Sequence, residues 1–183
     1  VIAATTGLPM AATARKLASA GATVVIVARD PEKLEATRKE IADSGGRCFA
    51  YSCDLSDMSA IDAVAKKILA EHTTVEFLVN NAGRGMKYVS NEFMSEPTSF
   101  WEVTPETWRL VIEANVNGPF LMARHAVPKM LKAGWGRIVN VSVSQSTMRR
   151  RGRHRASRSG ANSGAAAVCP RHAGPRTAAR TGG

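Results

Sequence analysis

The stretch that decides the fold is Asn80-Asn81-Ala82-Gly83, which directly follows the apolar run Phe77-Leu78-Val79. A short, continuous apolar run is typical of a strand that is buried on both faces of a parallel sheet. In open α/β sheets, ligands bind beyond the carboxyl ends of the strands, where small residues let a ligand approach the backbone. Asn81, Ala82 and Gly83 are therefore candidate ligand-binding residues. An Asx turn that merely closes the strand would read the same.

Strand and helix patterns alternate on both sides of this motif. Val1 and Ile2 indicate the start of a first strand, and further strands are predicted over residues 23–28, 47–53 and 137–141. Helices are predicted to begin after the N-caps Asp30, Asp57 (or Ser56) and Thr104, because Ser, Thr and Asp are preferred there. The last helix continues to Gly134 with an apolar stripe, which consists of Phe120, Ala123, Val127 and Met130. The sequence therefore predicts an α/β fold with five β/α units.

The order of these units and the Asn-Asn-Ala-Gly motif resemble the short-chain dehydrogenase/reductase family over residues 12–142. The resemblance implies a Rossmann-type, doubly wound parallel sheet in three α/β/α layers, incomplete at its C-terminal side. It also implies an NAD(P)(H)-dependent oxidoreductase, which reversibly reduces a carbonyl or oxidises an alcohol on a small molecule. In relatives, the long last helix helps to build a homo-oligomer, although a buried core stripe would look the same from the sequence.

The cofactor expectations rest on four short segments. The family's phosphate-binding turn carries three glycines, because only glycine lets the backbone approach the pyrophosphate, whereas residues 3–10 keep only Gly7. The second strand ends at Ala28 and is followed by Arg29, which favours NADP(H) over NAD(H). The alternative is that Arg29 is a surface residue beside a helix cap. The resemblance places Asp54 and Leu55 beside the adenine, and Asn81, Ala82 and Gly83 along the cofactor.

The catalytic residues implied by the resemblance are only partly present. Asn115 matches the family's catalytic Asn, and Ser142 is our candidate for the catalytic Ser, although ungapped matching puts that position on Val143. The family's Tyr-x-x-x-Lys pair would fall near Ala156 and Gly160, and no Tyr follows Tyr88 and no Lys follows Lys132. Because the Tyr donates the proton, we expect this chain to be inactive or nearly so.

Residues 149–183 differ sharply in composition from residues 1–148. They hold nine Arg, eight Ala, six Gly and no acidic residue, and they carry nearly all of the net charge of +10. Such a segment buries too little apolar surface to offset chain entropy, so we expect a partial NAD(P)-binding domain over 1–148 and a disordered basic tail over 149–183. A frameshift near Met148 would explain this composition, because GC-rich codons that are read out of frame yield these residues.

Two alternative functions follow from the same features. The chain could be a noncatalytic nucleotide-binding or dimerising remnant, or the run Arg149–Arg155 could bind nucleic acid. We favour nucleic acid less, because no aromatic residues interleave the run to stack on bases. The aromatic-rich connection over residues 84–103 could shape an apolar substrate site or pack a small core of its own.

Composition bounds the remaining possibilities. Three cysteines form no disulfide framework, and no apolar run of transmembrane length or signal peptide is present. We therefore expect a cytoplasmic protein that makes no membrane contact and holds no metal.

Overall fold

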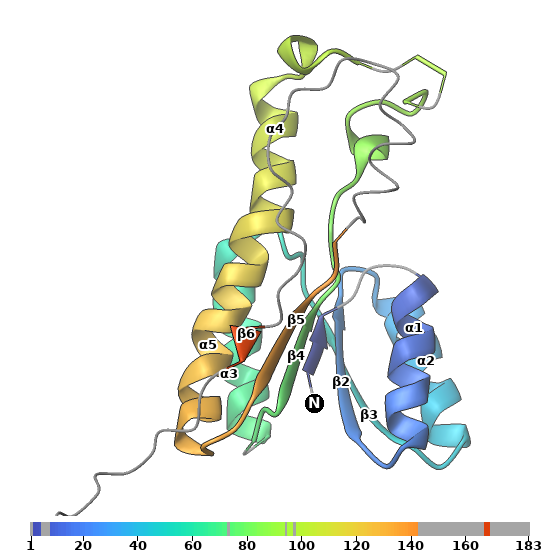
Figure 1. Cartoon of the computed structure of the whole chain (residues 1–183). Helices are drawn as coiled ribbons and strands as arrows, with labels where there is room; N and C mark the ends of the chain where they lie inside the picture. The colour runs from blue at the N-terminus through green and yellow to red at the C-terminus, as the bar shows by residue number, and fades with distance from the viewer. Residues whose placement is uncertain are drawn as a thin grey trace, which may run out of the picture.

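A central sheet organises the computed structural model (Figure 1). The structure describes residues 2–4, 8–72, 74–93, 95–96, 98–142 and 167–168. Within these ranges the strands are β1 (Ile2–Ala4), β2 (Thr23–Ala28), β3 (Arg47–Ser52), β4 (Phe77–Asn80), β5 (Arg137–Asn140) and β6 (Ala167–Val168), in the sheet order β3-β2-β1-β4-β5-β6. The first five are parallel, and β1 pairs with β2 on one side and β4 on the other. This order confirms the predicted Rossmann-type sheet.

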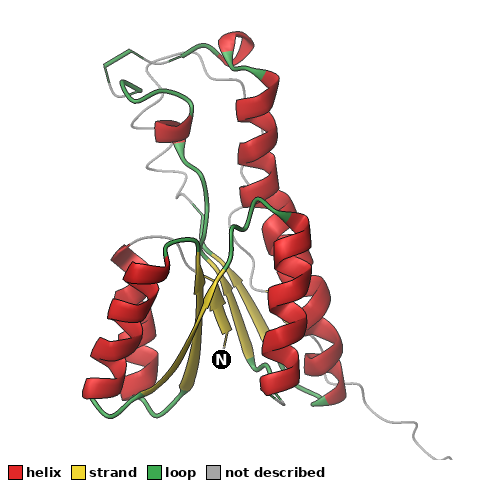
Figure 2. Cartoon of the chain, turned by 180° about the vertical axis from the view of Figure 1, so that it is seen from behind, coloured by secondary structure: helices red, strands yellow, loops and turns green. Residues whose placement is uncertain are grey.

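Helices cover both faces of the sheet, as Figures 1 and 2 show. They are α1 (Leu8–Ser19), α2 (Pro31–Asp43), α3 (Met58–Glu71), α4 (Pro105–Ile112) and α5 (Gly118–Lys132). The pair α1 and α2 lies on one face, and α3 and α5 lie on the other. A π-helical turn over Glu113–Asn117 joins α4 to α5, so the two form one long rod whose α4 end projects beyond the sheet.

Alternating side chains of β2 supply two separate cores. Val24 and Ile26 pack against α1 and α2, whereas Val25 and Val27 face α3 and α5. Successive side chains of a strand point to opposite faces. Because helices cover both faces of the sheet, all four side chains are nearly inaccessible to solvent. The smaller core also contains Ala14, Ala18, Leu34 and Ile41; the larger includes Ile61, Ile68, Leu78, Leu121, Met122 and Met130. This two-sided burial explains the continuous apolar run in the sequence.

The predicted helix starts are confirmed. The Asp30 carboxylate accepts a hydrogen bond from the Lys33 amide, and Pro31 is the first helical residue. Asp57, rather than Ser56, caps α3 by accepting from the amides of Ser59 and Ala60. Thr104 caps α4 in the same way, again with a proline in the next position.

The apolar stripe predicted for the last helix does not coincide with the buried face of α5. Phe120 is 63% exposed and Met130 is buried, and the other buried apolar side chains belong to Leu121, Met122 and Ala126. Each residue turns an α-helix by about 100°, so a difference of one position moves a side chain to another face. A π turn separates α4 from α5, so one regular helical period does not run through both helices.

The predicted tail lies almost wholly outside the described residues. Within it, the structure describes only β6, which pairs antiparallel with β5 through Ala167 and Val168. No helix in the described part of the chain is both long and apolar enough to cross a bilayer.

Candidate functional site

The strands β2, β3 and β4 end at one edge of the sheet, and a pocket of about 610 Å³ opens there. Five of the predicted cofactor residues line this pocket, namely Arg29, Asp54, Leu55, Ala82 and Gly83. They come from three loops that are far apart in the sequence. The pocket therefore lies where the parallel-sheet rule predicts a ligand.

The residues of the Asn-Asn-Ala-Gly motif have different surroundings in the structure. Asn80 is buried, and its side-chain amide donates to Asn140 Oδ1 over 2.9 Å, which ties the ends of β4 and β5 together. Asn81 is half-buried and precedes the pocket wall without lining it. The absence of a side chain at Gly83 lets the Asn115 side chain approach closely, because a Cβ added at Gly83 would lie 3.0 Å from Asn115 Oδ1.

Asn115, the predicted catalytic Asn, lies in the π turn and clamps the chain that follows Gly83. Its Oδ1 accepts from the Arg84 amide over 2.7 Å, and its Nδ2 donates to the Arg84 carbonyl over 2.9 Å. Both ends of the side-chain amide are thus used by one backbone residue. The clamp fixes the Gly83 wall of the pocket relative to the long helical rod.

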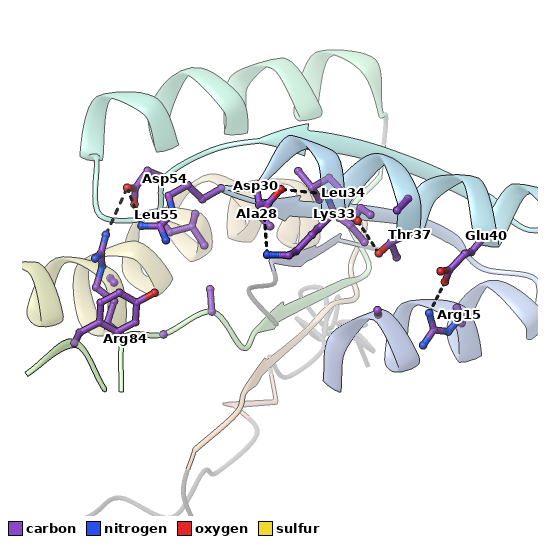
Figure 3. A pocket seen from close by; sticks show the side chains of 18 residues that line it. Arg15, Ala28, Asp30, Lys33, Leu34, Thr37, Glu40, Asp54, Leu55 and Arg84 are labelled. Carbon is purple, nitrogen blue, oxygen red and sulfur yellow. Dashed lines mark hydrogen bonds and ion pairs between the residues drawn. The ribbon is translucent and has the colours of Figure 1, made fainter. Parts of the chain in front are cut away.

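Asp54 is one of three acidic residues that line the pocket, and it lies at the end of the pocket near Arg84 (Figure 3). Its Oδ1 accepts from the Ser56 amide and hydroxyl over 2.9 and 2.6 Å, and its Oδ2 lies 3.5 Å from Arg84 and 3.9 Å from Arg29. Partial burial by itself would raise the pKa of Asp54. The hydrogen bonds from Ser56 and the charges of Arg84 and Arg29 outweigh burial, so the pKa is lower than its ordinary value. The carboxylate is therefore an ionised acceptor at neutral pH.

Basic side chains gather along the pocket beside the end of β2. Arg29, Lys33 and Arg15 all line it. Lys33 Nζ lies 2.7 Å from the Asp30 carboxylate, and Arg15 is paired with Glu40 over 2.6 Å (Figure 3). Asp30 caps α2 and is engaged by Lys33, and this ion pair and hydrogen bond lower the pKa of its carboxyl. Asp30, the acidic residue nearest the end of β2, therefore serves as the N-cap of α2.

Lys33, Arg15 and Arg84 were not predicted from the sequence as pocket residues. Lys33 had a usable signal, because it lies in the first turn of α2, which directly follows the ligand-facing end of β2. The sequence held no such signal for Arg15 and Arg84, since their positions in the pocket depend on how α1 and the loop after β4 pack across the sheet edge.

The remaining predicted residues are not brought into this pocket. Ser142 is exposed just after β5, at the same edge of the sheet, and does not line the pocket. Gly7, Val143, Ala156 and Gly160 lie outside the described residues. In the part of the chain that the structure describes, no cluster of three His, Cys, Asp or Glu side chains could hold a metal ion.

The described groups suit a flat anionic ligand that also carries hydrogen-bond donors. Ala28, Ala82 and Gly83 offer small, apolar walls, Arg29 and Lys33 offer cations, and Asp54 offers an ionised acceptor. A nucleotide combines a planar base with anionic phosphates, so the pocket chemistry fits that class of ligand.

Comparisons with known proteins agree with this chemistry. A family model described as short chain dehydrogenase matches residues 1–164. The chain is 34% identical to a fatty acyl-CoA reductase of Acinetobacter baylyi over 129 residues, which cover 70% of this chain and 41% of that protein. It is 33% identical to a 3-oxoacyl-[acyl-carrier-protein] reductase of Aquifex aeolicus, with 72% of this chain and 49% of the relative covered. The chain thus spans less than half the length of these two curated relatives.

Solved structures are similar to more than three quarters of the chain. A metagenomic short-chain oxidoreductase in complex with NADP shares 39% identity at a TM-score of 0.70, covering 79% of this chain and 62% of that one. A variant of actinorhodin polyketide ketoreductase with NADPH shares 30% identity at a TM-score of 0.65, covering 77% and 52%.

Proposed function

Because this chain belongs to the short-chain dehydrogenase/reductase family, we propose that its pocket binds NADP(H) in preference to NAD(H). The observation that carries the proposal is the set of cations beside the end of β2. Arg29 and Lys33 line the pocket there, and Asp30 is already engaged as the cap of α2. Two structures similar to this chain were solved with NADP or NADPH, which supports the same choice.

The 2′-phosphate of NADP(H) is the group that these cations would recognise. Arginine presents planar N–H donors that match phosphate oxygens, and a charge-assisted hydrogen bond contributes about 1.5–3 kcal/mol. The Arg29 side chain is 55% exposed and lies 3.9 Å from Asp54, so its guanidinium can turn toward a ligand. NAD(H), which lacks the phosphate, would gain nothing from this residue.

Replacing Arg29 tests the cofactor preference. Arg29→Met is expected to raise the Kd of NADPH about tenfold or more and to leave the weaker Kd of NADH nearly unchanged, as measured by calorimetry. Arg47→Met is the matched control, because Arg47 is exposed at the start of β3, away from the pocket. An equal loss for both cofactors, or no loss for NADPH, would contradict the proposal.

The residues proposed to bind the cofactor are Arg29, Asp54, Leu55, Ala82 and Gly83, with Gly7 and Asn81 carried over from the sequence motif. When bound, the cofactor supplies or accepts a hydride. Asn115 and Ser142 are the proposed catalytic residues, and Asn115 would hold the pocket wall while Ser142 polarised a carbonyl oxygen. The small-molecule substrate would be a carbonyl compound or alcohol.

We propose that the chain as printed carries out little or no turnover, because its sequence offers no Tyr-x-x-x-Lys to donate the proton. General acid catalysis contributes about 10²–10⁴-fold to a rate. The test incubates the purified chain with NADPH and a carbonyl panel that includes acyl thioesters, the substrate class named for two relatives. We expect NADPH binding without oxidation; steady NADPH oxidation that depends on the carbonyl would refute the proposed inactivity.

We also propose a homo-oligomer built on the α4–α5 rod. Val116, Phe120 and Leu131 are 54%, 63% and 56% exposed, and their spacings of four and eleven residues place them on one side of a helix. Trp108, which lies on α4, is a further exposed apolar side chain of the rod. Burying such a patch against a second copy would remove it from water.

A further inference from the structure

Arg84 is a cation held inside the wall of the pocket. Its side chain is only 14% exposed, the lowest exposure of any charged pocket residue whose ion pair the structure records. Its Nη2 donates to Ser56 Oγ over 3.0 Å and lies 3.5 Å from Asp54 Oδ2. Its Cζ lies 4.9 Å from the centre of the Tyr88 ring, so the guanidinium has an aromatic partner.

The position of Arg84 is fixed at both of its ends. Asn115 holds its backbone amide and carbonyl, and Ser56 and Asp54 hold its guanidinium. The residue therefore bridges the loop after β4, the loop after β3 and the π turn. In Figure 3 it reaches toward Asp54 at the end of the pocket away from Arg15.

From this geometry we infer that Arg84 positions the base of the bound nucleotide, by orienting the Asp54 carboxylate and by presenting a planar cation to the ring. The inference rests on the proposed function, because it assumes that the nucleotide occupies this pocket. A guanidinium can stack its planar face on a flat π system while its edge binds a carboxylate, whereas a lysine ammonium has no planar face to stack. Asp54, held by Arg84 and Ser56, then accepts a hydrogen bond from an exocyclic amine of the base.

The unused donors of the Arg84 guanidinium support a ligand-binding role in addition to its ion pair with Asp54. The recorded hydrogen bonds of the side chain, among the described residues, all come from Nη2. Its Nη1 donors thus keep their capacity for a ligand.

Binding of two ligands by four proteins tests the inference. The ligands are NADPH and adenosine 2′,5′-bisphosphate, which is the half of NADP that carries the base and the 2′-phosphate. The proteins are the wild-type chain, Arg84→Met, Arg84→Lys and Arg38→Met. The last is a matched control, because Arg38 is an arginine of α2 that pairs with Glu35 and does not line the pocket.

Arg84→Met is expected to raise the Kd of both ligands by the same factor, about tenfold, because the lost contacts belong to the adenosine half. Arg84→Lys keeps the charge but not the planar face, so we expect it to recover less than half of this loss on a logarithmic scale. Arg38→Met should bind both ligands like the wild-type chain. Thermal unfolding of each variant separates loss of binding from loss of folding.

Three results would overturn the inference. Unchanged affinity in folded Arg84→Met would remove any role for this side chain in binding. Full recovery of affinity by Arg84→Lys would show that charge alone matters, and loss of NADPH affinity without loss of bisphosphate affinity would place Arg84 at the nicotinamide half. If the wild-type chain bound neither ligand, the proposed function would fail first, and this inference would fail with it.

Discussion

The carboxylate of Asp54 accepts hydrogen bonds from Ser56 and forms ion pairs with Arg84 and Arg29. Its low pKa means that the folded state favours the ionised form. A group whose pKa is lower in the folded than in the unfolded chain stabilises the fold above its unfolded pKa of about 4. That stabilisation disappears as the pH falls through the folded-state pKa.

Asp54→Asn should therefore lower the urea midpoint at pH 6, and the difference from wild type should shrink at pH 3. At pH 3, below the unfolded pKa, the carboxyl of the unfolded wild-type chain is largely protonated, so part of the free energy that the fold gains from the ionised form is lost. Equilibrium urea unfolding of both proteins at the two pH values measures this. A difference that stays constant between pH 6 and pH 3 would mean that Asp54 stabilises the fold without its charge.

Among single residues, those near the ends of strands could be predicted to lie in the pocket. Those whose positions depend on long-range contacts could not. Asp54 and Gly83 lie two and three residues after the ends of β3 and β4, so the sheet rule alone brings them to one edge. Arg84 also follows β4 closely, yet its role depends on the turn of the chain that Asn115 enforces. No local pattern in the sequence records that long-range hydrogen bond.

At the scale of elements, the start of α5 is packed against the loop that carries the pocket residues. A Cβ added at Gly118 would lie 2.8 Å from the Leu55 carbonyl oxygen, which is a backbone atom and cannot rotate away. The absence of a side chain at Gly118 therefore lets the helical rod approach the loop after β3.

Gly118→Ala is expected to lower the free energy of unfolding by about 1–3 kcal/mol, because overpacking forces the helix and the loop apart. It should also weaken nucleotide binding, since Leu55 and Asp54 would move with the loop. Gly85→Ala is the matched control, because a Cβ there would have no atom within 4 Å. Chemical denaturation and calorimetry measure the two effects, and wild-type stability in Gly118→Ala would contradict this packing argument.

The starts of the helices could be predicted from local chemistry more reliably than the buried faces of the helices. Asp30, Asp57 and Thr104 were identified as caps because their side chains bond amides only a few positions away. The buried face of α5 depended instead on what packs against the helix, since Leu121, Met122 and Ala126 are buried whereas Phe120 is exposed. The π turn over Glu113–Asn117, which a regular helical period does not reveal, carries the proposed catalytic residue Asn115.

At the scale of the whole molecule, the α4–α5 rod presents the exposed apolar side proposed as an interface. Phe120→Glu should reduce the molar mass measured by light scattering from that of the oligomer to that of the single chain, because a buried carboxylate without a partner is costly. Met58→Glu is the control, since Met58 is 52% exposed at the start of α3. A wild-type chain that is monomeric, or an oligomer unaffected by Phe120→Glu, would refute this interface.

The sheet order could be predicted because five β/α units constrain the path of the chain strongly. Right-handed crossovers and helices on both faces leave few arrangements for such a pattern. The pairing of β5 with β6 was not predicted, because Ala167 and Val168 stand in a segment whose composition gives no strand signal.

The place of β1 at the centre of the sheet has a consequence for synthesis on the ribosome. Ile2–Ala4 is the first described strand to be made, and it pairs with residues 25–27 on one side and 78–80 on the other. At about 5–20 residues per second, the second neighbour follows the first by several seconds. During that interval β2 can already pair with β1 and with β3 and can pack against α1 and α2, while the other edge of β1 still lacks its partner β4. Translation speed between codons 28 and 77 therefore sets how long the nascent chain exposes that edge to chaperones and to other chains.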